Sequence, residues 1–239
     1  MTMPIYSFLR NKIPGYIALL IFATIMSGLL MFFSSVELTG HVSDLTGQTF
    51  SLLTASAGNP YFLVTVCVLC SAPIISKLPK KAVVRLICQF AILLILSFIA
   101  KTALKHITEV PRPYSYQLQS LGIVHSVDEF YQLSAAEKEK AVQMATANVS
   151  GWRTSHWQGE TNYSFPSGHT IFAAVCVVFW GGFFWHRRQL AAASLLILWA
   201  TGVGISRIWL GMHWPTDILA SIVSAGLLYL LIPEWNDTN

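Results

Sequence analysis

Three short clusters of polar residues interrupt an otherwise apolar chain, and they carry side chains suited to binding and transferring a phosphate. The clusters are KHITEVPRP at 105–113, PSGH at 166–169 and SRIWLGMHWPTD at 206–217. Arginine matches phosphate oxygens in pairs, whereas lysine acts as a point charge. Lys105, Arg112 and Arg207 are therefore predicted to bind the phosphate.

The PSGH cluster predicts a helix start that can hold an anion. Ser167 can cap this helix, and Gly168 lets a ligand approach the backbone closely. The first N–H groups of a helix lack partners within it and lie at the positive end of its dipole. We therefore expect Ser167 and Gly168 to complete the phosphate site.

Two histidines and an aspartate supply the groups for a phosphoryl transfer. A neutral imidazole can attack phosphorus, and an imidazolium can protonate a departing oxygen near neutral pH. Asp217 follows His213 by four residues, so its carboxylate could accept the Nδ1 proton and leave Nε2 free to attack. We predict that His213 is the nucleophile and that Asp217 orients it. His169 is then the acid and, in a second step, the base that activates water.

The elements that must position these clusters are apolar. Hydrophobic residues make up 54% of the 239 residues and charged residues only 11%, against about 25% charged residues in a typical soluble domain. This composition indicates an integral membrane protein. The sequence contains no basic run with interleaved aromatic residues, which would indicate nucleic acid as a partner. We expect an all-α fold that forms a single membrane domain over residues 1–239.

Six segments approach the roughly 20 apolar residues that a membrane-spanning helix requires. They are Tyr16–Ser35, Tyr61–Ser76, Val83–Leu104, Thr170–Trp185, Leu190–Ile205 and Asp217–Pro233. The first segment follows Arg10 and Lys12, as a secretory signal would, but it is longer than a signal core and has no obvious cleavage site. We interpret it as a span, which gives a bundle of six transmembrane helices.

Basic residues set the expected orientation of this bundle. They precede the first span or lie in, or at the edge of, the second-to-third and fourth-to-fifth connections, as Arg10, Lys12, Lys77, Lys80, Lys81, Arg85, Arg187 and Arg188. Positively charged connections favour the cytoplasmic side. Both termini are therefore expected in the cytoplasm, and all three polar clusters are expected together on the opposite face.

Residues 105–169 form the longest segment outside the predicted spans. Within them, SAAEKEKAVQMATA at 134–147 is typical of a helix, because Ser134 can cap it and Glu137 can complete a capping box. We expect a small helical lid over the outer face, inserted at about 105–169.

The cysteines do not indicate a metal or redox site. Cys67 and Cys70 form a CxxC pair, which could bind a metal or act in redox chemistry. Their neighbours are apolar and no second pair accompanies them, so we interpret them as small packing residues within a span.

The three clusters resemble the signature motifs of the type 2 phosphatidic acid phosphatase superfamily, which includes vanadium haloperoxidases and bacterial acid phosphatases. KX6RP matches Lys105–Pro113, PSGH matches Pro166–His169, and SRX5HX3D matches Ser206–Asp217, with every signature position filled. Within the superfamily, VDEFYQL, SHWQGETNYSFPSGHT and WATGVGISRIWLGMHWPTD resemble the bacterial phosphatidylglycerophosphatase B group. This similarity extends from the third predicted span to the sixth.

The resemblance implies a six-helix bundle in the bacterial inner membrane with a periplasmic site, a phosphohistidine on His213, and no metal or other cofactor. It implies substrates among the membrane lipid phosphates, which include phosphatidylglycerol phosphate, undecaprenyl diphosphate, phosphatidic acid and diacylglycerol diphosphate. It assigns phosphate binding to Lys105, Arg112, Ser167, Gly168 and Arg207, and it matches Glu160 to a position that contacts lipid headgroups.

Two kinds of alternative function remain, and only the first uses the same residues. A dedicated undecaprenyl-diphosphate phosphatase or a lipid phosphotransferase would need the same phosphohistidine, and only pocket width and acceptor access would distinguish them. A membrane transporter or flippase belongs to another class and would mark its route with ionisable residues in the middle of its spans. Here these residues cluster at one end of the spans. The sequence gives no indication of the oligomeric state.

Overall fold

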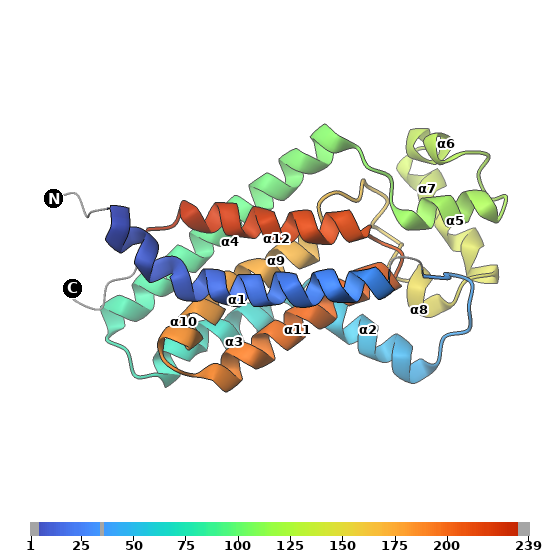
Figure 1. Cartoon of the computed structure of the whole chain (residues 1–239). Coiled ribbons are helices and arrows are strands. Elements are labelled where there is room, and N and C mark those ends of the chain that lie inside the picture. Colours follow the sequence, from blue (N-terminus) through green and yellow to red (C-terminus); the bar gives the residue numbers. More distant parts are fainter. Residues whose placement is uncertain (1–4, 34–35, 234–239) are drawn as a thin grey trace.

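The computed structural model describes residues 5–33 and 36–233, and every regular element in these ranges is a helix. Figure 1 shows an elongated bundle with the small helices α5–α8 gathered at one end. The predicted all-α fold is confirmed. The bundle helices are α1 (Ile5–Phe32), α2 (Asp44–Ser56), α3 (Phe62–Ile75), α4 (Lys80–Thr108), α9 (Gly168–Cys176), α10 (Gly182–His186), α11 (Leu190–Trp209) and α12 (Pro215–Leu230).

The outer helices present apolar side chains to their surroundings. Leu20 on α1, Phe98 on α4 and Leu198 on α11 are each more than 60% exposed. Within the described residues, four helical stretches are long and apolar enough to cross a membrane, namely Arg10–Phe32, Lys80–Thr108, Gly168–His186 and Leu190–Trp209. Helices α3 and α12 are apolar but shorter. Because a soluble protein buries such surfaces, this exposure is that of a membrane protein.

A continuous helix formed by α9, a π-helical turn (Val177–Gly181) and α10 lies at the centre of the bundle. Its side chains from Ile171 to Trp180 are almost completely buried. It packs against α1 through glycines, since a Cβ on Gly182 would lie 2.8 Å from the Gly15 Cα. Small residues are the usual means by which membrane helices approach closely.

The segment that precedes the second predicted span is itself helical, which the sequence interpretation did not expect. The predicted span Tyr61–Ser76 coincides with α3, but the preceding residues form α2, and a short turn separates the two helices. Helix α2 contains polar residues throughout, so it gives no long apolar run. Helix α4 extends through Thr108, so that Lys105 lies in its last turn rather than after it.

The segment between α4 and α9 contains the predicted lid helix. It forms α5 (Pro113–Ser120), α6 (Val127–Gln132), α7 (Ala135–Met144), a 3-10 turn (Ala145–Ala147) and α8 (Gly151–Thr154). The predicted capping box of Ser134 and Glu137 is present at the start of α7. These helices share a small core in which Tyr114 stacks on Trp157, with ring centroids 4.9 Å apart. The Trp157 indole donates to the Leu210 carbonyl at 2.7 Å, which fastens this core to the connection between α11 and α12.

Candidate active site

The three polar clusters meet at the end of the bundle that carries α5–α8. A cavity of about 770 Å³ opens there, and residues from all three clusters line it. The predicted site residues in its lining are Lys105, Arg112, Glu160, Gly168, His169 and His213. The two histidines therefore face one cavity, as a shared substrate phosphate requires.

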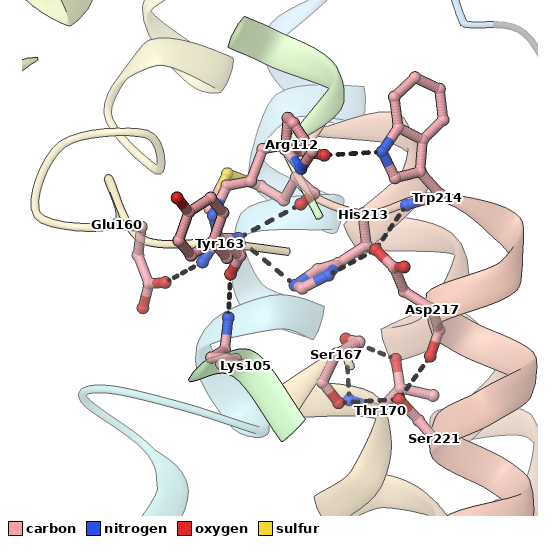
Figure 2. A network of polar contacts seen from close by, with 12 residues as sticks. Lys105, Arg112, Glu160, Tyr163, Ser167, Thr170, His213, Trp214, Asp217 and Ser221 are labelled. Atoms are coloured by element: carbon pink, nitrogen blue, oxygen red, sulfur yellow. Dashed lines mark hydrogen bonds and ion pairs between the residues drawn. The ribbon is translucent and has the colours of Figure 1, made fainter. Parts of the chain in front are cut away.

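His213 is held between a carboxylate and a guanidinium. Its Nδ1 lies 3.3 Å from Asp217 Oδ2, and its Nε2 lies 3.4 Å from Arg112 Nη1. The same Asp217 oxygen accepts the Trp214 N–H at 2.9 Å, because Asp217 is the third residue of α12 and caps its start. Figure 2 shows these contacts. The predicted four-residue pairing is present, although His213 itself lies just before the helix.

The two partners of His213 determine which tautomer fits. A carboxylate can only accept and a guanidinium can only donate, so both contacts are satisfied when the proton is on Nδ1 and Nε2 carries a lone pair. Burial lowers the pKa of His213 well below its usual value, and the positive charge of Arg112 lowers it further. The imidazole is therefore neutral at physiological pH, with its unprotonated Nε2 beside the cavity.

Arg112 is the most extensively bonded cation of the site, and its side chain is 1% exposed. Its Nη2 contacts Glu160 Oε2 at 2.7 Å (Figure 2). The same nitrogen donates to Asn162 Oδ1 at 2.5 Å, and Nε donates to the Asn162 carbonyl at 2.8 Å. Its backbone N–H donates to the Tyr131 hydroxyl at 2.8 Å. The segment 160–163 thus covers one side of the guanidinium.

Lys105 reaches the same segment from the last turn of α4. Its Nζ donates to the Tyr163 carbonyl and lies 3.4 Å from Asn162 Oδ1. The Tyr163 ring stacks on Tyr131, with centroids 4.6 Å apart. Two predicted phosphate ligands, Lys105 and Arg112, therefore share Asn162 as an acceptor.

Ser167 caps α9, as the sequence predicts. Its hydroxyl oxygen accepts the Thr170 N–H at 3.3 Å and the Thr170 hydroxyl at 2.9 Å. The Ser167 carbonyl accepts from the Ser221 hydroxyl on α12 at 3.1 Å. These bonds fix the start of α9, where Gly168 and His169 line the cavity.

Arg207 is not among the residues that line the cavity, and it is 2% exposed. Its Nη1 donates to Thr54 Oγ1 at 2.6 Å, whereas its Nε is buried without a hydrogen-bond partner. A buried donor without an acceptor is costly. This unpaired N–H is consistent with the expectation that Arg207 binds a ligand.

The sequence interpretation missed several residues of the site. Gly58 follows α2 and lies against the His169 ring. Asn162 and Tyr163 contact Lys105, and the Tyr131 hydroxyl accepts from the Arg112 backbone N–H. Asn162 and Tyr163 lie four and three residues before Pro166, the first residue of the PSGH cluster, and this closeness to a motif could have indicated them. Tyr131 is brought in only by the tertiary fold.

The cavity continues away from the polar end as an apolar space between α3 and α4. Phe62 and Leu63 of α3, and Leu94 and Phe98 of α4, line this part. Lys101, one turn before Lys105, lies where the polar and apolar parts join. One cavity therefore combines cationic groups with a hydrophobic extension.

The fold and the site together define a helical membrane protein whose cationic pocket holds two histidines at one end of the bundle. The model of the PAP2 superfamily matches residues 86–239. Phosphatidylglycerophosphatase B of Haemophilus influenzae is 36% identical over 192 residues, which cover 76% of this chain and 78% of the relative. The chain belongs to the PAP2 superfamily, and the resemblance inferred from the three motifs is confirmed.

Two further relatives are informative. Phosphatidylglycerophosphatase B of Escherichia coli is 41% identical over 132 residues, which are 54% of this chain and 52% of the relative. The chain thus spans about half the length of that relative. Undecaprenyl-diphosphatase BcrC of Bacillus subtilis is 32% identical over 74 residues, which are 31% of this chain and 36% of the relative.

Proposed function

We propose that this chain is a membrane lipid phosphate phosphatase that works through a phosphohistidine on His213. The observation that carries the proposal is the single cavity into which His213, His169, Arg112 and Lys105 project and which continues between apolar side chains of α3 and α4. A lipid phosphate has the matching shape, because its charged group sits at the membrane surface while its tails stay in hydrocarbon.

In the first step, Lys105, Arg112 and Arg207 bind the phosphate oxygens, and the start of α9 adds the backbone N–H groups behind Ser167 and Gly168. The lone pair of His213 Nε2 attacks phosphorus, so that a P–N bond forms as the P–O bond to the lipid breaks. Burial and the positive charges of Arg207 and Arg112 lower the pKa of His169, whereas the negative charge of a bound phosphate raises it. The substrate thus favours the protonated form of His169, which gives its proton to the departing oxygen. Asp217 stabilises the positive charge that develops on the His213 ring.

In the second step, a water molecule replaces the dephosphorylated lipid. His169, now neutral, removes a proton from this water as the oxygen attacks phosphorus. The P–N bond breaks, its electron pair returns to His213 Nε2, and inorganic phosphate leaves. Both histidines are then in their starting protonation states, and no metal takes part in either step.

The names of the relatives suggest the substrates. We propose phosphatidylglycerol phosphate and undecaprenyl diphosphate, with phosphatidic acid and diacylglycerol diphosphate as further members of the class. A dedicated undecaprenyl-diphosphate phosphatase is the second candidate, which the similarity to BcrC favours. We propose that Glu160, which is 44% exposed and lines the cavity, contacts polar headgroup atoms of these lipids.

We further propose that six helices span the bacterial inner membrane as one domain over residues 1–239, with both termini cytoplasmic and residues 105–169 forming a periplasmic lid. The lid helices lie at one end of the bundle, whereas α1 begins and α12 ends at the other (Figure 1). The connection between α10 and α11, which contains Arg187 and Arg188, is also at the latter end, in keeping with the cytoplasmic preference of basic residues. A cysteine at position 134 should react with an impermeant thiol reagent added to spheroplasts, whose inner membrane is intact. Labelling that occurs only after lysis would indicate the opposite orientation.

The decisive experiment measures phosphate release from each lipid by the purified protein in detergent with EDTA. Wild-type protein should release phosphate without added metal, and His213→Ala should abolish release. Activity that survives the substitution would remove His213 from its proposed role. A transporter would release no phosphate from any substrate.

A further inference from the structure

Helix α2, which none of the three motifs includes, is packed tightly against α11 and the lid. The Phe50 ring stacks on Trp209 with centroids 4.8 Å apart, and the Trp199 indole donates to Ser56 Oγ at 2.8 Å. On the lid side, a Cβ on Gly47 would lie only 2.3 Å from the Trp152 ring. The side chains of α2 that face α11 are therefore held in fixed positions.

Thr54 is the residue of α2 that reaches the proposed phosphate site. It is 2% exposed, and its hydroxyl oxygen accepts from Arg207 Nη1 at 2.6 Å. Within the described part of the chain, it is the only side chain that accepts a hydrogen bond from this guanidinium. The side chain of arginine has several rotatable bonds, whereas threonine is stiff at χ1. Thr54 therefore supplies a rigid acceptor that can select one guanidinium orientation.

The bond to Thr54 uses one particular nitrogen of the guanidinium. Nη1 is occupied, while Nε, on the opposite edge with Nη2, is buried and unpaired. The Nε–Nη2 edge presents two parallel N–H groups, which is the fork that binds two phosphate oxygens together. We propose that Thr54 is a positioning residue, whose hydroxyl orients Arg207 so that this edge faces the substrate phosphate.

A neutral histidine anchors the same face of α2 one turn earlier. His156 Nε2 lies 3.0 Å from Ser51 Oγ, three residues before Thr54. Burial, together with the positive charge of Arg207, lowers the pKa of His156 to about 4. At neutral pH this imidazole bonds to Ser51 without adding another positive charge beside Arg207, so it supports the position of Thr54.

This inference rests on the proposed function, because it assigns the partner of a proposed phosphate ligand. The test compares Thr54→Val, which keeps the shape but removes the hydroxyl, with Thr54→Ser, which keeps the hydroxyl. Thr49→Val is the matched control, since the Thr49 hydroxyl lies on the exposed face of α2 and bonds the Leu45 carbonyl. Each variant is checked for a monodisperse gel-filtration profile and then assayed for phosphate release and for binding of orthovanadate, measured as a thermal shift.

We expect Thr54→Val to lower kcat/KM by about 10- to 100-fold and to weaken orthovanadate binding by a similar factor. Thr54→Ser should stay within a few-fold of wild type and Thr49→Val should equal it. In an Arg207→Met background, Thr54→Val should have no further effect. Two results would overturn the inference. One is a Thr54→Val protein that binds orthovanadate as tightly as wild type does. The other is a Thr54→Val substitution that lowers kcat/KM by the same factor in the Arg207→Met background as in the wild-type background.

The two readouts separate this inference from the proposed function. Wild-type protein that binds orthovanadate but releases no phosphate would refute the phosphatase, while loss of binding in Thr54→Val would still support the positioning role. If wild-type protein neither binds orthovanadate nor releases phosphate, both conclusions fail.

Discussion

Gly58 offers a test of whether the position of His169 controls catalysis. It lies in the turn between α2 and α3, with its backbone against the imidazole. A Cβ added at this position would lie 2.2 Å from His169 Nε2 and 2.8 Å from its Cδ2. The φ of Gly58 is not in the left-handed region, so Gly58→Ala introduces no backbone strain of that kind. The substitution acts mainly by displacing the ring.

The size of the displacement follows from the contact distance. An ordinary contact needs roughly 3.5 Å, so the ring atom must move by about 1.3 Å. A misplacement of about 1 Å in a catalytic group costs on the order of 100-fold in rate, which is about 2.7 kcal/mol in the activation barrier. The imidazole is the tip of a rotatable side chain, so the cost in folding free energy should be only about 1 kcal/mol. Gly58→Ala should therefore lower kcat strongly while the protein stays folded.

The assay is phosphate release from a lipid phosphate at saturating substrate, with thermal unfolding in the same detergent. Gly28→Ala is the matched control, because a Cβ on Gly28 meets no atom within 4 Å. We expect a kcat near 1% of wild type for Gly58→Ala and an unchanged kcat for Gly28→Ala. A folded Gly58→Ala protein with wild-type kcat would show that the position of the His169 ring is not critical, and would refute the reasoning.

Three further predictions concern other contacts. Glu160→Gln should lower KM up to about 5-fold at low salt, because the amide can still contact headgroup atoms but no longer competes as a charge with the substrate phosphate for Arg112; a higher KM would mean that the negative charge of Glu160 helps to bind substrate. Lys12→Met should destabilise the protein by about 3 kcal/mol, measured by denaturation in detergent, because the buried ammonium donates at 2.7 Å each to the carbonyls of Tyr229, in the last turn of α12, and of Ile232, just after it; exposed Arg10→Met is the control. Because the pKa of His213 is lowered, its neutral form persists as pH falls, so the acid limb of kcat should have its midpoint below about pH 6.5. A His213-dependent midpoint at or above that value would contradict this assignment.

Contacts between neighbouring residues in the sequence were predictable. The spacing of His213 and Asp217 predicts their contact, and the pairing of Ser134 with Glu137 predicts the start of α7. Helix α2 was missed because its mixed sequence gives no apolar run. Ser43 caps α2 by accepting the Thr46 N–H, so a search for capping residues could have found it.

Contacts between distant residues could not be predicted in this way. Arg112 and Glu160 are 48 residues apart, and Thr54 and Arg207 are 153 apart. Nothing in the local pattern around any of these residues selects its partner, because the pairing depends on how α2, α11 and the segment between α4 and α9 pack. The motifs identified the cations of the site, whereas the fold determines what holds each one in place.

The two buried arginines differ in how their charges are compensated, and this difference shows where a ligand is needed. Arg112 has the carboxylate of Glu160 at 2.7 Å. Within residues 5–33 and 36–233, Arg207 contacts no carboxylate, and its Nε has no acceptor. A buried cation without a counter-charge is costly, so folds rarely keep one unless function requires it. A phosphate beside Arg207 would supply both the negative charge and the missing acceptor, which explains why the fold keeps this guanidinium buried and nearly unpaired.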